Sequence, residues 1–134
     1  MKYLVMIYVD PAELSRMPEE EFKRRMAGCL AHADELRGAG KLLDAQMLQG
    51  AQTARSLRVR NGRPMVTDGP YTETKELLAG FNLIEAEDID EAVRMASEFP
   101  WTEIGCVEVR PILDIGAVRE QVHGASASGV RPGL

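Results

Sequence analysis

The segment that most restricts the fold is residues 2–9, KYLVMIYV, near the start of the chain. Its β-branched and aromatic residues predict a strand, which ends at Asp10 and Pro11. Alternate side chains of a strand point to opposite faces, and here both sets are apolar. One set is Tyr3, Val5, Ile7 and Val9, and the other is Leu4, Met6 and Tyr8. Both faces of the sheet that contains this strand must therefore be covered.

Two helices follow from the spacing of apolar residues. The first starts after Pro18 with three acidic residues, which suit the positive end of a helix dipole, and it ends at Gly38 and Gly40. Its predicted inward stripe is Phe22, Met26, Cys29, Leu30, Ala33 and Leu36. The second starts at a capping-box pattern, Asp88 to Glu91, and runs to about Phe99. Its predicted inward residues are Ala92, Val93 and Ala96.

A hairpin over residues 56–67 is the clearest local prediction. Asn61 and Gly62 both tolerate positive φ, as a type I′ turn requires. This turn pairs Leu57 with Val66 and Val59 with Pro64, which gives the hairpin one apolar face. Further strands are predicted at residues 41–49, 79–86 and 105–113.

The element order is therefore strand, helix, strand, hairpin, strand, helix, strand. This order predicts a ferredoxin-like split βαβ fold of the α+β class, with an antiparallel sheet and helices on one face. Two helices cover only one face of such a sheet, whereas the first strand is apolar on both. We expect a second copy to cover the other face, which gives a homodimer through the sheet face.

Composition narrows the class of protein. The chain of 134 residues has 16 basic and 21 acidic residues, which disfavours a broad nucleic-acid surface. Its two cysteines, Cys29 and Cys106, are too few for a disulfide framework and fit a reducing compartment. The apolar run at the start is too short to cross a membrane. We expect a cytoplasmic protein that binds neither nucleic acid nor membrane directly.

The densest polar segment is the loop over residues 67–76, TDGPYTETKE, which is followed by Gly80 and Phe81. This loop closely resembles the signature of DGPF-domain proteins within the YCII-related family. The hairpin before it and the segment VEVRP, residues 107–111, also resemble that family, and the resemblance spans residues 1–113. Residues 114–134 are then a tail that is loose or holds a short helix around Val118–Val122. Tyr71 stands where the family usually has phenylalanine.

The resemblance implies a dimeric α+β barrel with a cleft between the sheet and the loop. The wider superfamily includes small enzymes of aromatic-compound degradation, and DGPF genes often accompany extracytoplasmic-function sigma factors. Some YCII relatives are proposed to use a helix histidine paired with an aspartate. We place that histidine near Cys29 of this sequence, not at His32, so the dyad is not transferred.

Asp68 is the candidate catalytic residue. In a cleft beside Tyr71, its carboxylate would be desolvated and able to act as an acid or a base. The structural alternative is an Asx-turn, in which Asp68 bonds the backbone around Gly69 and Pro70 while Tyr71 packs. Glu73, Lys75 and Glu76 form either a solvated ion-pair cluster or the polar wall of that cleft.

Candidate substrate-binding residues are Tyr71, Glu73, Lys75, Asn82 and Arg110. Strand alternation places Arg110 on one face with Cys106 and Glu108, where an ion pair between Glu108 and Arg110 is the structural alternative. His32 lies at the margin of the first helix stripe and is expected to be partly exposed. Cys29 is expected to be a buried, unreactive thiol.

Motifs for metals and nucleotides are missing from the sequence. It contains no CxxC, HExxH, GxGxxG or GxxxxGK pattern, so we expect no metal and no cofactor. Four arginines beside the hairpin, at positions 55, 58, 60 and 63, form the only basic patch and are expected to be a solvated edge.

Two functions remain open from the sequence. The first is a small dimeric enzyme that uses acid–base chemistry on a small polar or aromatic molecule. The second is a non-catalytic regulatory or scaffold dimer associated with a sigma factor.

Overall fold

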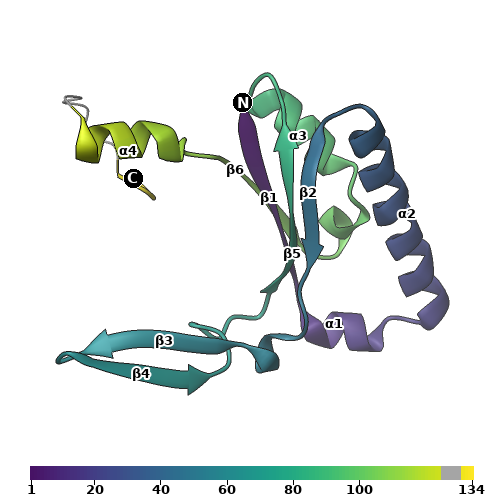
Figure 1. The fold of residues 1–134 in the computed structure, drawn as a ribbon. Coiled ribbons are helices and arrows are strands. Elements are labelled where there is room, and N and C mark those ends of the chain that lie inside the picture. Colours follow the sequence, from purple (N-terminus) through teal and green to yellow (C-terminus); the bar gives the residue numbers. More distant parts are fainter. Residues whose placement is uncertain (125–130) are drawn as a thin grey trace.

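The computed structural model describes residues 1–124 and 131–134. The main sheet is antiparallel and has the strand order β2-β5-β1-β6, with α2 and α3 on one face (Figure 1). Its strands are β1 (Lys2–Val9), β2 (Leu42–Met47), β5 (Leu77–Glu85) and β6 (Cys106–Pro111). The main helices are α2 (Glu19–Gly38) and α3 (Ile89–Ser97). The predicted ferredoxin-like α+β class is confirmed.

Short elements join these parts. They are α1 (Pro11–Arg16), η1 (Ala51–Thr53), η2 (Pro100–Glu103) and α4 (Ile115–His123). The helix α1 is not among the elements expected from the sequence; it starts because the Asp10 carboxylate accepts a hydrogen bond from the Ala12 backbone N–H at 2.9 Å. The predicted cap of α3 is confirmed, since Asp88 Oδ1 accepts from the Glu91 backbone N–H at 2.8 Å.

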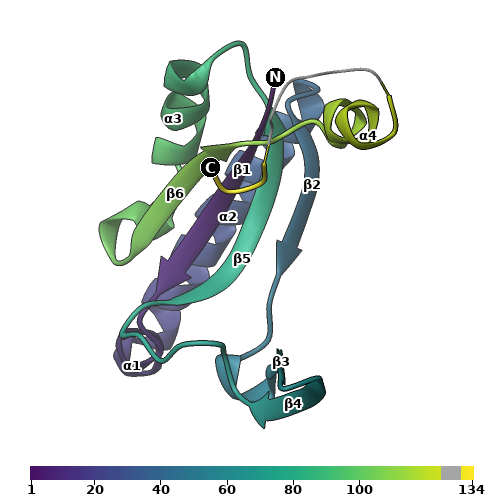
Figure 2. The same cartoon turned by 90° about the vertical axis from the view of Figure 1, so that its left-hand side faces the viewer.

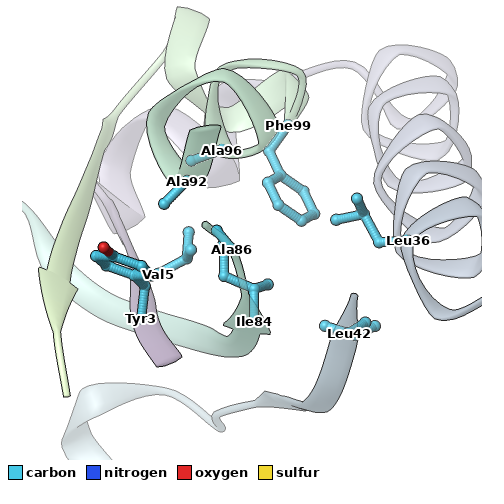
Figure 3. Packing of buried hydrophobic residues seen from close by; sticks show 9 residues of the cluster. All are labelled: Tyr3, Val5, Leu36, Leu42, Ile84, Ala86, Ala92, Ala96 and Phe99. Atoms are coloured by element: carbon cyan, nitrogen blue, oxygen red, sulfur yellow. The ribbon is translucent and has the colours of Figure 1, made fainter. Parts of the chain in front are cut away.

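The core lies between the sheet and the two helices (Figure 3). The face of β1 that carries Tyr3, Val5, Ile7 and Val9 is buried there. Nine residues form the main cluster: Tyr3, Val5, Leu36, Leu42, Ile84, Ala86, Ala92, Ala96 and Phe99. Their burial holds both helices against the sheet, because apolar area removed from water stabilises by about 25 cal/mol per Å².

The opposite face of the sheet, which we term the open face, carries no helix in the described structure. The register pairs Leu4 with Leu83 and Met6 with Phe81, so these apolar side chains share that face with Tyr8. All five are only half-buried. The prediction that β1 is apolar on both faces is therefore confirmed, and residues 1–124 and 131–134 place no helix over one of these faces.

The hairpin forms a separate two-stranded sheet, the hairpin arm, made of β3 (Arg55–Arg60) and β4 (Arg63–Asp68). The predicted register is confirmed, as are positive φ angles of 52° at Asn61 and 75° at Gly62. The arm does not join the main sheet, and its apolar face of Leu57, Val59 and Val66 is exposed. Both the arm and α4 project on the side of the open face (Figures 1 and 2).

Three predictions about helix faces are wrong. Phe22 and Leu30 of the α2 stripe are exposed, and so is Val93 of α3, which was expected to point inward. His32, expected to be partly exposed, is buried between α2 and α3. Its Nε2 atom donates to the Met95 carbonyl at 2.7 Å, and its ring meets Phe99 edge-on at a centroid distance of 4.6 Å. Burial is tolerated because the ring has these partners.

The C-terminal segment beyond residue 113 includes α4, which covers the short helix expected around residues 118–122. The prediction of a loose tail concerns mainly residues 125–130, and these lie outside the described residues. The domain boundary at residue 113 stays a prediction. None of the helices described here is long and apolar enough to cross a membrane.

Candidate functional site

Two neighbouring hollows lie beside the loop over residues 67–76, which we term the signature loop, and the end of β1. Together we term these hollows the Tyr8 cleft. The hollows measure about 620 and 940 Å³ and share Tyr8, Thr74 and Glu76. The smaller is completed by Asp10, Glu13, Lys75 and Cys106. The larger extends over Tyr71 to the base of the hairpin arm, residues 53–58, and to the segment after β2, residues 48–51.

Backbone bonds anchor the signature loop to the hairpin arm. The Gly69 N–H donates to the Ala54 carbonyl, and the Ser56 hydroxyl donates to the Gly69 carbonyl, both at 2.8 Å. Gly69 has φ of 96°, which only glycine adopts without strain, so a glycine is required at this anchor. Further along, the Thr74 hydroxyl donates to the Glu76 carbonyl at 2.7 Å. These bonds fix the two ends of the cleft wall.

Tyr8 is the central group of the cleft. Partial burial raises the pKa of its hydroxyl above the ordinary value of 10.0, and the nearby Glu108 carboxylate raises it further. At neutral pH the hydroxyl is therefore protonated and able to donate. Its contact within the chain is the Met6 sulfur at 3.8 Å, a weak acceptor. Tyr8 can thus offer a hydrogen bond to a molecule in the cleft.

The raised pKa of Tyr8 predicts how the ionisation of this side chain depends on pH. The neutral phenol is favoured in the folded state, so its contribution to stability is present below pH 10 and is lost as the pH rises through the folded pKa. The difference in absorbance at 295 nm between the wild type and Tyr8→Phe should therefore report a phenol that ionises above pH 10. We expect Tyr8→Phe to change the free energy of unfolding at neutral pH by less than about 0.5 kcal/mol. An ionisation at or below pH 10 would contradict the assignment.

Charged residues line the smaller hollow. Lys75 and Glu76 face it, and among the described residues neither takes part in an ion pair. They therefore fit the polar-wall alternative better than the ion-pair cluster. Lys75 is the one basic residue in the lining of this hollow, and it shares that lining with the carboxylates of Asp10, Glu13 and Glu76.

Asp68 lies outside the linings of both hollows. Its Oδ1 atom pairs with Arg55 Nε at 3.1 Å, and 87% of its side chain is exposed. The expected Asx-turn is replaced by this ion pair across the hairpin arm. The desolvation on which the acid–base hypothesis depends is not present in this chain alone, and the catalytic role of Asp68 stays a prediction.

The other candidates lie at several places. Tyr71 lines the larger hollow with its ring largely exposed, whereas Glu73 is exposed and lines neither hollow. Arg110 is on the open face, where its Nε atom donates to Glu108 Oε2 at 3.0 Å, so the ion-pair alternative is confirmed. Asn82 pairs with Val5 and lies on the helix-covered face. The sheet therefore separates Asn82 from Tyr71, Lys75 and Arg110.

Sequence reasoning missed the role of Tyr8 in the cleft. A signal was present, since Tyr8 is the last polar-tipped residue of the open-face set and precedes the end of β1. Only the strand order, which brings β6 and the signature loop beside the end of β1, places it in a cleft. Within residues 1–124 and 131–134, no group of three or more His, Cys, Asp or Glu side chains is arranged to hold a metal ion.

Comparison with known proteins gives three results. A sequence model of the YCII-related domain matches residues 1–116. An uncharacterized protein of Rhizobium meliloti is 38% identical over 116 residues, which cover 84% of this chain and 92% of that protein. A solved structure of 5-chloro-2-hydroxyhydroquinone dehydrochlorinase (TftG) from Burkholderia phenoliruptrix, in complex with 2,5-dihydroxybenzoquinone, is similar with a TM-score of 0.53. That match is 20% identical and covers 84% of this chain and 94% of the other, so it supports the fold.

Proposed function

The chain belongs to the YCII-related domain family, and from this membership we propose that it is a homodimer that binds a small hydroxylated ring compound in the Tyr8 cleft. In the enzymatic form of this proposal, a cleft residue transfers a proton to or from the ring oxygen. The observation that carries the proposal is that the family-like signature loop and the Tyr8 hydroxyl line the same hollows.

The chemistry of the cleft supports this ligand class. A protonated Tyr8 hydroxyl donates a hydrogen bond, and the Lys75 ammonium attracts an ionised ring oxygen. The Tyr71 ring offers an apolar wall on which a flat molecule stacks. Glu76 lines both hollows and can accept a proton from a ring hydroxyl. The similar structure TftG is a dehydrochlorinase of a hydroxylated ring and was solved with a dihydroxybenzoquinone.

Three features support the homodimer. The open face presents half-buried apolar side chains at its centre, including Met6 and Phe81. The hairpin arm and α4 both project on that side and carry exposed apolar residues, among them Leu57 and Ile115 (Figure 1). A second copy related by twofold symmetry would cover the face and contact both projections. Burial of the Arg110 charge at such an interface is tolerated because Arg110 already has an ion-pair partner, Glu108.

The experiment is calorimetric titration with 2,5-dihydroxybenzoquinone. We expect saturable binding by the wild type, and about tenfold weaker binding by Lys75→Met, because a charge-assisted hydrogen bond is lost. Lys23→Met is the matched control, since Lys23 lies on the exposed face of α2 and pairs with Glu19. Equal binding by wild type and Lys75→Met would contradict the assigned cleft. Absence of binding to this and related ring compounds would favour the regulatory alternative.

Asp68→Asn separates the two roles considered for Asp68. If Asp68 transfers a proton, the variant should fold and bind normally but lose turnover of a ring substrate. If Asp68 acts only through Arg55, the variant should lose less than about 1 kcal/mol of stability, because the pair is exposed, and should keep its activity. Urea denaturation together with a turnover assay distinguishes these outcomes.

A further inference from the structure

The two hollows of the Tyr8 cleft differ in charge. Among the residues that the structure describes, the smaller hollow is lined by the ammonium of Lys75 and by the carboxylates of Asp10, Glu13 and Glu76. The larger hollow is lined by Arg55 and Arg58 and shares the Glu76 carboxylate with the smaller one. A molecule that spans both hollows therefore meets an acidic end beside β1 and a basic end beside the hairpin arm.

The two arginines of the larger hollow differ in what they bind within the chain. Arg55 Nε pairs with Asp68 at 3.1 Å, and Arg55 Nη1 donates to the Ala54 carbonyl at 2.9 Å. In residues 1–124 and 131–134, no hydrogen bond or ion pair involves the Arg58 guanidinium. Its N–H donors are therefore available to a bound molecule.

Arg58 lies on the face of the hairpin arm that meets the signature loop. Alternation along β3 puts Arg58 on the same face as Ser56, whose hydroxyl donates to the Gly69 carbonyl of that loop at 2.8 Å. Arg60 follows on the same face, but it lies two residues nearer the turn and lines neither hollow. Position, and not residue type, therefore separates Arg58 from Arg60.

A guanidinium without an ion-pair partner in the chain matches a carboxylate group of a ligand. Its planar fork of N–H donors binds both carboxylate oxygens at once, which adds geometric specificity to the attraction between the charges. At the other end of the cleft, three carboxylates outnumber Lys75, so that end suits a hydroxyl group better than a second carboxylate. The larger hollow, at about 940 Å³, is in the size range of pockets for small ligands.

We propose that the ligand of the Tyr8 cleft is a hydroxylated aromatic acid, with its carboxylate bound to Arg58 in the larger hollow and its ring hydroxyl beside Tyr8 in the smaller one. This inference rests on the proposed function, because it specifies the class of ring compound that the same cleft binds. Arg58 is then the residue that distinguishes an acid from an uncharged ring compound.

The test compares 4-hydroxyphenylacetate with 4-hydroxyphenylacetamide by calorimetric titration at neutral pH. The two compounds share the ring and the hydroxyl, but the amide is uncharged. We expect the wild type to bind the acid about tenfold more tightly, because the amide lacks the charge-assisted hydrogen bonds to the guanidinium. We expect Arg58→Gln to bind the two compounds within twofold of each other, mainly through weaker binding of the acid. The variant should fold normally because Arg58 is exposed.

Two other variants locate the two ends of the ligand. Arg60→Gln is the matched control, since it removes the same charge from the same face of β3 but outside the lining of the cleft, and it should keep the tenfold preference for the acid. Tyr8→Phe should weaken the binding of both compounds by a similar factor, because it removes the donor to the hydroxyl that they share.

Three results would overturn this inference: equal binding of the two compounds by the wild type, a preference that survives Arg58→Gln, or a preference that Arg60→Gln removes as well. If 2,5-dihydroxybenzoquinone still binds in a manner that depends on Lys75, the proposed function stands and only the carboxylate is wrong. If neither the quinone nor the two phenols bind, the proposed function and this inference both fail.

Discussion

Leu83→Lys is expected to convert the proposed homodimer into a folded monomer. Leu83 is at the middle of the open face, between Leu4 on β1 and Asp44 on β2. In a monomer the new lysine reaches solvent and stays hydrated. In a dimer, each copy would bury an uncompensated charge, at a cost of about 3–5 kcal/mol, and twofold symmetry applies this cost twice.

Sedimentation velocity at micromolar concentration measures this effect, with circular dichroism to confirm the fold. Val93→Lys is the matched control, because Val93 is a half-exposed position on α3, on the other side of the sheet. The control should sediment like the wild type. If Leu83→Lys keeps the mass of the wild type, the interface is not on the open face.

Phe99→Ala is expected to lower the free energy of unfolding by about 3–5 kcal/mol. Phe99 is 1% exposed and contacts the core cluster between α2 and α3. Its ring also packs edge-on against His32, whose Nε2 atom bonds the Met95 carbonyl. Removing the ring leaves a cavity and loosens the contact that holds the two helices together, which is a large part of the stability of a domain this size.

Urea denaturation measures the loss. Val93→Ala serves as the comparison on the same part of the chain and should cost less than about 1 kcal/mol, because Val93 is half-exposed. A loss below about 1 kcal/mol for Phe99→Ala would mean that the packing between α2 and α3 contributes little.

Local patterns predicted most of the fold. The alternation in β1 and the turn at Asn61 and Gly62 depend only on residues close in sequence, and both predictions are confirmed, including the hairpin register. The position of the hairpin arm was not predictable in this way. Its apolar alternation suits a strand in a packed sheet, yet among the described residues no strand outside the hairpin pairs with β3 or β4.

Exposure on the helices depends on contacts between distant segments. The stripe of α2 includes Phe22 and Leu30 by spacing, but both side chains stay exposed, and the Phe22 ring contacts Trp101 of η2 at a centroid distance of 6.2 Å. His32 is buried because α3 brings Met95 and Phe99 to it, which no periodicity within α2 indicates.

The candidate site was predictable in part. The loop over residues 67–76 does line a cleft, and its residues Tyr71 and Lys75 are in the lining. Tyr8 was missed because its place in the site depends on strand order. Asn82 was grouped with Arg110, although cross-strand register puts them on opposite faces, which spacing within one strand does not reveal.

The most direct test of this account is the mass of the wild-type protein in solution, measured by sedimentation equilibrium at micromolar concentration. The open face, the hairpin arm and α4 carry half-buried or exposed apolar side chains, so we expect a species of twice the chain mass of 14.8 kDa. A stable monomer at that concentration would contradict the account, because the apolar open face would then be exposed to water.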